Sequence, residues 1–410
     1  MRKTAKKIIN DPVHGFITIS GQVLLDIIQH PYFQRLRRIS QLGLTHLVYP
    51  GAMHTRFQHA IGAMFLMDEA LKNLRERGHN IGKWEAEGAK AAILLHDIGH
   101  GPFSHALENS IVGSVSHEEI SRMIMWEINE HLEGKLYMAL EIFNGTYEKK
   151  FLTQLISSQL DVDRMDYLRR DSFYTGVSEG VIGTQRILKM LDVRDDSLVV
   201  EEKGIYSIDN FLNSRRIMYW QVYLHKTVLS AEFTLINILK RAKELSKRGE
   251  DLSDNEALNF FLYNDISRHD FKHEEECLEM FVQLDDFDIL SAVKKWTRHP
   301  DPVLSDLCSR ITDRRLLKTE LSNTPFDEGR VQELREKLKQ TLPFAADTPE
   351  YYVFTGKSSN NSYDFTRDNI NFRMKDGSIK ELSDVSDQWK AASPAGITEK
   401  YYLCYPKSLK

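Results

Sequence analysis

The chain has 410 residues, of which 41% are hydrophobic and 28% are charged, a composition typical of a globular protein. Its formal net charge of −5 excludes a global basic field of the kind that recruits nucleic acid. Three widely spaced cysteines and the lack of a run of about 18 apolar residues argue against secretion and against a membrane span, so we expect a cytoplasmic protein.

The N-terminal region predicts a turn, a short strand and then helices. The sequence from Asn10 to Gly15 is typical of a turn, and the alternating run at 16–19 predicts a strand. Helical periodicity follows at once. Thr55 is a candidate N-cap for a helix that reaches Leu74.

The middle of the chain is predominantly helical in pattern. Helical spacing covers 118–129 and 151–171, and it returns over 210–345. Between these segments, strand signals at 198–200 and 205–208 predict a hairpin.

The composition changes near Pro343, where strand-like segments replace the helical pattern. The dipeptide Asp376-Gly377 is a good two-residue turn between two of the later segments. The strand-like segments are 351–354, 370–373, 379–380 and 401–405.

A run of histidines cannot be explained by core packing. A buried helix is expected over 84–95, and it ends on the doublet His96-Asp97 before two glycines interrupt it. His100 and His105 follow. One buried histidine is usually a hydrogen-bonded core residue, but several at one junction each need a partner, which a divalent metal can supply. We interpret this stretch as metal ligands plus acid–base groups.

Two other segments offer polar side chains at helical spacing. Arg56 and His59 are three residues apart and share a helix face, which fits a ligand beside a phosphate-binding arginine or, equally, a capped surface helix. The charge-rich segment 161–171 places Asp163 and Tyr167 on one face. Alone, such a segment is normally a solvated helix surface.

The order His59, His96-Asp97, Asp163 resembles the ligand set that names the HD-domain superfamily of phosphohydrolases. Further blocks resemble its deoxynucleoside-triphosphate triphosphohydrolase branch, most of all the sterile-alpha-motif and HD-domain enzymes of animals and their bacterial relatives. The resemblance covers about residues 5–240. Its blocks are 10–15, 33–37, 41–43, 50–52, 54–62, 96–105, 161–171 and 215–226.

Together, the patterns and the resemblance predict a mainly α fold: an HD-domain helical bundle with a small mid-chain hairpin and a small α+β C-terminal unit. We expect an HD-type catalytic body at 1–345, with its core motifs at about 5–240 and a helical extension at 241–345. The α+β unit is expected at 346–410, and its role stays open.

The resemblance implies that His59, His96, Asp97 and Asp163 hold one divalent ion, with manganese, iron, magnesium, cobalt and nickel all possible. It implies attack at the α-phosphorus of a deoxynucleoside triphosphate, which releases inorganic triphosphate. The departing 5′-oxygen needs a proton, and His105 is our candidate donor.

The remaining implied roles concern orientation and substrate binding. Glu108 would orient the proton donor. The candidate phosphate-binding residues are His100, His117, Arg56, Arg164 and Arg215. The candidate sugar-binding residues are Gln41, Tyr167, Asp171 and Tyr223. Without the resemblance, the aromatic residues would be interpreted as a core stripe and His117 as a helix-start residue.

The resemblance also implies a homo-oligomer, a dimer or tetramer, and a nucleotide activator at a subunit interface. Gln34, Arg37 and Lys7 match the expected activator site, but Gln29 stands where the animal enzymes have an aspartate that reads guanine. A glutamine amide cannot accept two hydrogen bonds from guanine as a carboxylate does, so guanine-specific activation is in doubt.

Other functions remain open at this stage. The same ligands could serve another HD-type phosphohydrolase, such as a nucleotidase, a phosphodiesterase or a guanosine-tetraphosphate hydrolase. A nucleotide-binding sensor without turnover is the third possibility.

Overall fold

The computed structural model describes residues 6–103, 107, 110–112, 115–361, 363, 369–389 and 397–409. Among these residues the fold is mainly helical, as predicted, and the strands form three small sheets. The helices up to residue 246 are α1 (Gln22–Gln29), α2 (Pro31–Arg35), α3 (Arg56–Glu76), α4 (Lys83–Leu95), α6 (His117–His131), α7 (Tyr137–Phe143), α8 (Lys150–Ile156), α9 (Val162–Thr175), α10 (Thr184–Met190), α11 (Ile205–Met218) and α12 (Lys226–Ser246). The later helices are α13 (Glu256–Tyr263), α14 (Arg268–His273), α15 (Glu275–Gln283), α16 (Asp286–Trp296), α17 (Pro302–Thr312), α18 (Glu328–Thr341) and α19 (Leu382–Val385).

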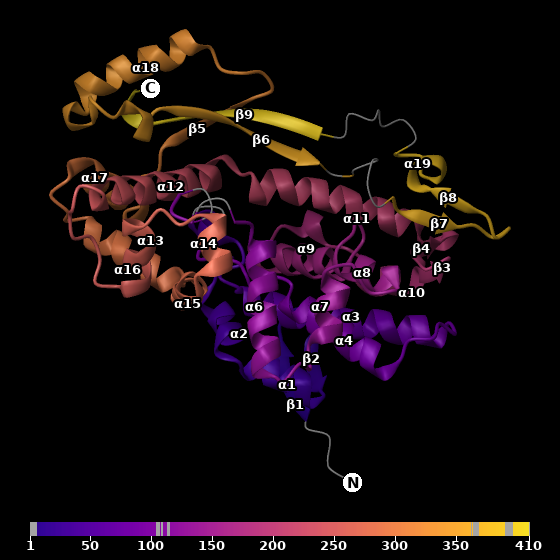
Figure 1. Cartoon of the computed structure of the whole chain (residues 1–410). Coiled ribbons are helices and arrows are strands. Elements are labelled where there is room, and N and C mark those ends of the chain that lie inside the picture. The colour runs from indigo at the N-terminus through magenta and orange to yellow at the C-terminus, as the bar shows by residue number, and fades with distance from the viewer. Residues whose placement is uncertain are drawn as a thin grey trace.

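The described chain begins with an antiparallel hairpin, β1 (Lys6–Asp11) and β2 (Gly15–Ser20), which lies at the opposite end of the molecule from α18 (Figure 1). The Asp11 carboxylate accepts hydrogen bonds from the backbone N–H groups of Val13 and His14 and so closes the turn. The predicted turn and strand are confirmed.

The helix pair α3 and α4 lies in the core, and α9 packs across α3. Gly62 makes this close packing possible, because a Cβ atom there would lie 2.1 Å from Asp166 Oδ1 on α9. The predicted helices at 55–74 and 84–95 are confirmed, while the expected helix at 151–171 is divided into α8 and α9.

The mid-chain hairpin exists, but the second of its predicted strands was wrong. Its strands are β3 (Leu191–Arg194) and β4 (Ser197–Glu201), joined at Asp195 and Asp196, whose φ angles of 48° and 59° suit a tight hairpin turn. The apolar run at 205–208 instead begins α11, in which Ile208 shares a buried helical stripe with Phe211 and Leu212 while Tyr206 is exposed.

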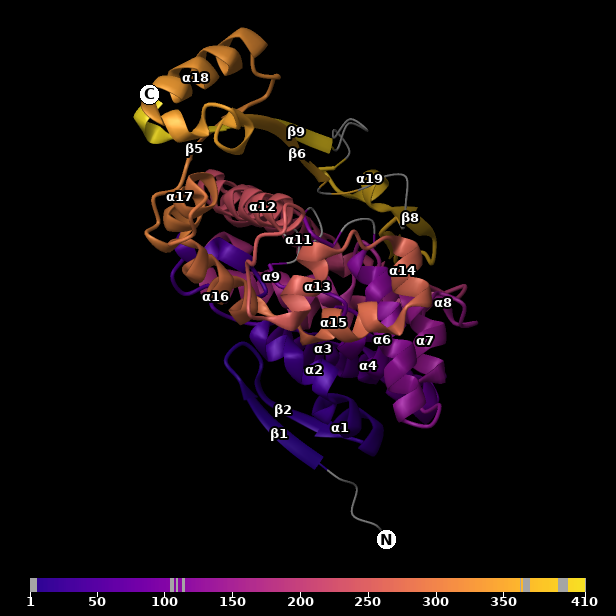
Figure 2. The ribbon, with the colours of Figure 1, turned by 60° about the vertical axis from the view of Figure 1, so that its left-hand side comes forward.

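The C-terminal strands form two sheets with earlier parts of the chain. The strands are β5 (Lys318–Ser322), β6 (Phe354–Asn361), β7 (Asn371–Arg373), β8 (Ile379–Glu381) and β9 (Ile397–Tyr405). One sheet has the order β5-β9-β6, and the other has the order β3-β4-β7-β8, in which β4 and β7 are parallel. In Figure 2, α12 lies between the first sheet and the helical body.

Two expectations for this region need correction. Residues 210–345 are not wholly helical, since β5 lies among them and pairs with β9. The strand expected at 351–354 starts only at Phe354. The turn at Asp376-Gly377 between β7 and β8 is confirmed in place, but it is longer than the predicted two residues, because Arg373 pairs with Ile379 and the Met374 N–H bonds to the Ser378 carbonyl oxygen. The division of the chain into two units near residue 345 remains a proposal. Each of the two C-terminal sheets contains strands from before and from after that residue.

Among the described residues, no helix is both long and apolar enough to cross a membrane.

Candidate metal centre and nucleotide site

Three side chains from three helical segments meet at one point. His59 lies on α3, His96 follows the end of α4, and Asp163 lies in the first turn of α9. Asp163 Oδ1 lies 3.1 Å from His59 Nε2 and 3.4 Å from His96 Nε2. One ligand atom from each residue lies within 4.8 Å of the others, so the three could hold a metal ion.

The donor atoms of this group are suited to a cation. Both Nε2 atoms are buried and lack a hydrogen-bond partner, whereas the opposite ring nitrogens are bonded: His59 Nδ1 to Asp166 Oδ2 at 2.8 Å and His96 Nδ1 to the Ile93 carbonyl oxygen at 2.6 Å. Metal-binding histidines usually have such a second partner, which fixes the tautomer that leaves Nε2 as the ligand.

Negative charge dominates at this point. Burial would lower the pKa of His59, but the neighbouring carboxylates of Asp163 and Asp166 outweigh burial and raise that pKa to about 10. For Asp163, burial acts to raise the pKa, yet the two histidines hold it far below the ordinary value. The site therefore stabilises positive charge in its centre.

Asp97, the fourth predicted ligand, lies beside the other three. Its Oδ1 is 3.4 Å from His96 Nε2 and its Oδ2 is 3.8 Å from His59 Nε2. Arg56 Nη1 donates to Asp97 Oδ2 at 2.6 Å, so this carboxylate joins the metal centre to an arginine.

His100 and His117 lie next to this carboxylate. His100 Nδ1 is 3.4 Å from Asp97 Oδ1, and its ring stacks on that of His117 with 4.0 Å between centroids. Burial, Arg56 and His117 lower the pKa of His100 well below its ordinary value. His100 is therefore neutral near pH 7, so one of its ring nitrogens can donate a hydrogen bond while the other accepts one.

Behind His59, a buried network links Asp166 to two histidines and an arginine, although His14 Nδ1 has no hydrogen-bond partner among the described residues. Asp166 accepts from His14 Nε2 at 2.7 Å and from Arg170 at 2.8 Å, in addition to His59. Arg170 also donates to Asp11 at 2.8 Å. Burial alone would raise the pKa of Asp166, but Arg170 and the two histidines hold it well below the ordinary value.

On the opposite side, a cavity of about 240 Å³ opens beside Arg56. Gln41 and Tyr223, two of the predicted sugar-binding residues, line it as well. The Tyr167 ring lies between this cavity and the metal centre, with its centroid 6.2 Å from that of Tyr223 and 6.4 Å from that of His59.

Asp171 anchors the wall of this cavity. Tyr223 Oη donates to Asp171 Oδ2 at 2.7 Å, and His54 Nε2 lies 2.7 Å from Asp171 Oδ1. Asp171 is 1% exposed, so it reaches the cavity mainly through Tyr223.

The two remaining predicted arginines lie at the margin of the site. Arg164 is paired with Asp161, and Arg215 lies over the ring of Tyr219, 5.9 Å from its centroid. Both positive charges act on Tyr167, whose pKa is raised by burial and by Tyr219. Of the predicted catalytic residues, His105 and Glu108 lie outside the described residues.

Sequence reasoning missed the residues that support the ligands. Asp166 and His54 are absent from the predicted site, although Asp166 stands three residues after Asp163 on the same helix. His14 was assigned only to a turn. The sequence did hold a signal for Asp166, which is an ionisable residue at helical spacing from the candidate ligand Asp163.

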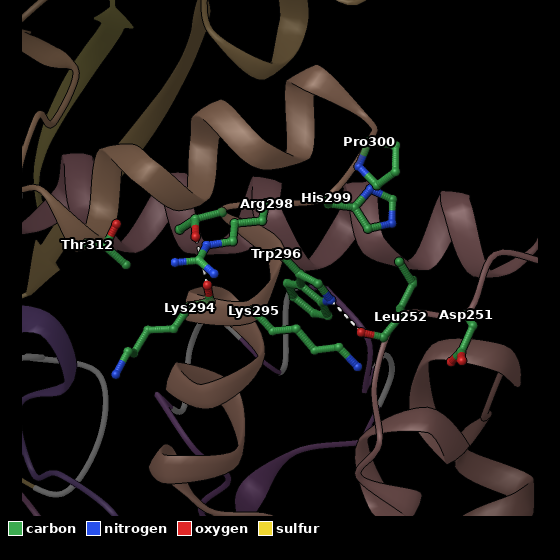
Figure 3. A pocket seen from close by; sticks show the side chains of 10 residues that line it. Asp251, Leu252, Lys294, Lys295, Trp296, Arg298, His299, Pro300 and Thr312 are labelled. Carbon is green, nitrogen blue, oxygen red and sulfur yellow. Dashed lines mark hydrogen bonds between the residues drawn. The ribbon is translucent and has the colours of Figure 1, made fainter.

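A separate pocket, of about 640 Å³, lies between α16 and α17 and contains none of the predicted site residues. Figure 3 shows Lys294, Lys295 and Arg298 around it, with Trp296 donating from Nε1 to the carbonyl oxygen of Leu252 at 2.7 Å. Lys295 is paired with Asp254 at 2.8 Å.

Comparison with known proteins identifies the helical body. Residues 56–171 match the HD domain model and residues 182–255 match that of the HD associated region. The protein YwfO of Bacillus subtilis strain 168 is 36% identical over 98% of this chain and 93% of its own length. A phosphohydrolase from Bacteroides thetaiotaomicron VPI-5482 has a crystal structure that matches with a TM-score of 0.94 at 53% identity, covering 98% of this chain and 100% of that one.

A relative with a named activity is more distant. The deoxynucleoside triphosphate triphosphohydrolase SAMHD1 homolog of Dictyostelium discoideum is 32% identical over 62% of this chain, and the match spans about half of that relative, 52%. The chain therefore belongs to the HD-domain phosphohydrolases, in the part of the family that is related to the deoxynucleoside triphosphate triphosphohydrolases.

Proposed function

We propose that the protein is a metal-dependent triphosphohydrolase that cleaves deoxynucleoside triphosphates into deoxynucleoside and inorganic triphosphate. The observation that carries this proposal is the meeting of His59, His96 and Asp163 next to a cavity lined by Gln41 and Tyr223. The kinship with triphosphohydrolases supports the substrate class. A cytoplasmic location is part of the same proposal.

His59, His96, Asp97 and Asp163 would hold one divalent ion. Imidazole and carboxylate donors suit manganese, iron, cobalt or nickel, and magnesium less well. When bound, such an ion would act as a Lewis acid that activates water near neutral pH.

The cationic and neutral donors around Asp97 would bind the phosphates. Arg56 is held by that carboxylate, which fixes the guanidinium beside the centre before substrate arrives. His100, stacked on His117, would donate a hydrogen bond to a phosphate oxygen. Arg164 and Arg215 would add positive charge from the other side.

The reaction also needs a proton for the 5′-oxygen when its bond to the α-phosphorus breaks. We assign this proton to His105, with Glu108 as its orienting partner. An imidazole is suited to this role because it exchanges a proton near neutral pH.

The sugar would lie against the aromatic wall. Tyr167 and Tyr223 pack edge to face, and the bond from Tyr223 to Asp171 fixes the wall in place. A rigid wall excludes an added 2′-hydroxyl by steric conflict and by the cost of burying it. Gln41 and Asp171 would bind the 3′-hydroxyl.

Assembly and activation are also proposals. We propose a dimer or tetramer with a nucleotide activator at a subunit interface. The Cζ atom of Arg37 lies 3.6 Å from the centroid of the Phe57 ring, and Arg37 Nε donates to Gln34 Oε1 at 2.9 Å. The side chains of Arg37 and Gln34 would form a flat polar surface for a nucleotide base. Light scattering with and without nucleotide tests this.

The function itself is tested with metal-loaded protein and each of the four deoxynucleotides and four ribonucleotides. Chromatography should detect triphosphate and deoxynucleoside, with ribonucleotides spared. Monophosphate or diphosphate products would indicate another HD-type phosphohydrolase. Saturable binding without products would indicate a sensor.

A further inference from the structure

Glu232 on α12 is an acidic residue that the proposed reaction does not use. Its carboxylate lines the same cavity as Gln41, Arg56 and Tyr223. Among the described residues, no hydrogen bond or ion pair reaches this carboxylate. Burial raises the pKa of Glu232 to about 7, and no neighbouring charge offsets that effect. The Glu232 side chain is partly exposed to the cavity, and an acceptor in such a site without a donor costs free energy, so a ligand that brings donors would relieve that cost.

The groups around Glu232 form a slot suited to a flat ring. Leu42, Phe103 and Leu224 supply apolar surface to the cavity. A Cβ atom on Gly43 would lie 3.8 Å from Phe103 Cδ1 and 3.9 Å from Glu232 Oε1. The Phe103 ring and the Glu232 carboxylate therefore both lie next to Gly43 in the cavity wall. Apolar surface with one polar group is the usual composition of a site that recognises an aromatic ligand.

The chemistry of a carboxylate selects among the four bases. An ionised carboxylate only accepts hydrogen bonds, and its two oxygens can accept two parallel ones. Guanine offers two adjacent donors, N1–H and the N2 amino group. Adenine and cytosine each place one donor next to an acceptor, and thymine places one donor between two acceptors.

We propose that Glu232 is a specificity-determining residue that binds the guanine edge of a deoxynucleoside triphosphate in this cavity. The effect of Glu232 on hydrolysis depends on the proposed function, whereas the binding of guanine by Glu232 does not.

The test compares the wild type with Glu232→Gln, which keeps the shape but replaces one acceptor by a donor. Glu256→Gln, an exposed glutamate at the start of α13, is the matched control. For each protein, kcat/KM and the equilibrium dissociation constant are measured separately for dGTP, dATP, dCTP and dTTP. Glu232→Leu provides a second variant if the glutamine variant folds poorly.

The wild type should prefer dGTP, and Glu232→Gln should lower kcat/KM for dGTP relative to dATP by about tenfold or more, through weaker binding. The control should match the wild type. A wild-type preference for another base, or an unchanged ratio in the variant, would overturn the proposal. If no nucleotide releases triphosphate, the proposed function is wrong, and the binding measurements then decide the role of Glu232. Guanine-selective binding that Glu232→Gln abolishes would support that role. Equal binding of all four nucleotides would overturn it.

Discussion

The two sides of the metal centre differ in how their polar groups are satisfied. Behind His59, both oxygens of Asp166 accept hydrogen bonds from two histidines and Arg170, and Arg170 also binds Asp11, although His14 Nδ1 has no partner among the described residues. On the cavity side, Gln41 Oε1 is buried without a partner.

This difference separates stability from function. A closed network can contribute to folding because its bonds exist in the native state, and each of its members would be left unsatisfied by loss of a partner. Unsatisfied groups reduce stability, and they persist where a ligand satisfies them. We therefore expect substitutions behind the centre to affect folding and those on the cavity side to affect turnover.

The largest effect is expected from Asp163→Ala, at the boundary between the two sides. This variant should lose its metal, and its rate of dNTP hydrolysis should fall about a thousandfold or more. Elemental analysis of the purified protein and product formation are the measurements. Asp254→Ala, an exposed aspartate, serves as control. Full metal content with unchanged rate would remove Asp163 from the site.

His105→Ala should lower the rate by about 10²- to 10⁴-fold while metal content and nucleotide affinity stay unchanged. The reason is that proton donation matters only when the 5′-oxygen departs. Rates and equilibrium binding are measured together, with the exposed His269 replaced by Ala as the control. A fully active variant would assign the proton to another group.

Asp166→Ala tests the closed side. We expect the free energy of unfolding to fall by about 3–5 kcal/mol, because a buried arginine and two histidines lose their acceptor. Denaturant unfolding of metal-free protein is the measurement, and Asp163→Ala is the comparison, for which little change is expected. Equal losses in both variants would contradict the distinction between the two sides.

The same variant has a predicted pH dependence. The folded-state pKa of Asp166 is depressed, so its contribution to stability is complete above the unfolded-state pKa and is lost as the pH falls toward the folded-state value. The stability difference between wild type and Asp166→Ala should therefore shrink in acid. A difference that grows as the pH falls would indicate that Asp166 is protonated in the native state.

The smallest effect is expected from Gln41→Leu on the cavity side. Removing an amide whose buried oxygen has no partner should leave stability unchanged or raise it by about 1 kcal/mol. KM for dNTPs should rise with little change in kcat, because a ground-state contact is lost. Steady-state kinetics and unfolding curves check both parts, and a loss of stability would show that Gln41 belongs to the fold.

The sequence predicted the candidate ligands because the order of His59, the doublet His96-Asp97 and Asp163 along the chain resembles that of the HD-domain superfamily. It missed the bond between His14 and Asp166, which joins residues 152 positions apart and has no local signal. The run at 205–208 was assigned to a strand because β-branched and aromatic residues favour strands, but packing of α11 decided otherwise. Pairing of β5 with β9 is equally non-local.

The most direct test of the central claim is hydrolysis of a dNTP by metal-loaded protein in ¹⁸O-labelled water, followed by mass spectrometry of the products. Attack at the α-phosphorus with departure of the 5′-oxygen predicts one labelled oxygen in inorganic triphosphate and an unlabelled deoxynucleoside. Label in orthophosphate or pyrophosphate, with a deoxynucleotide as the other product, would contradict the account.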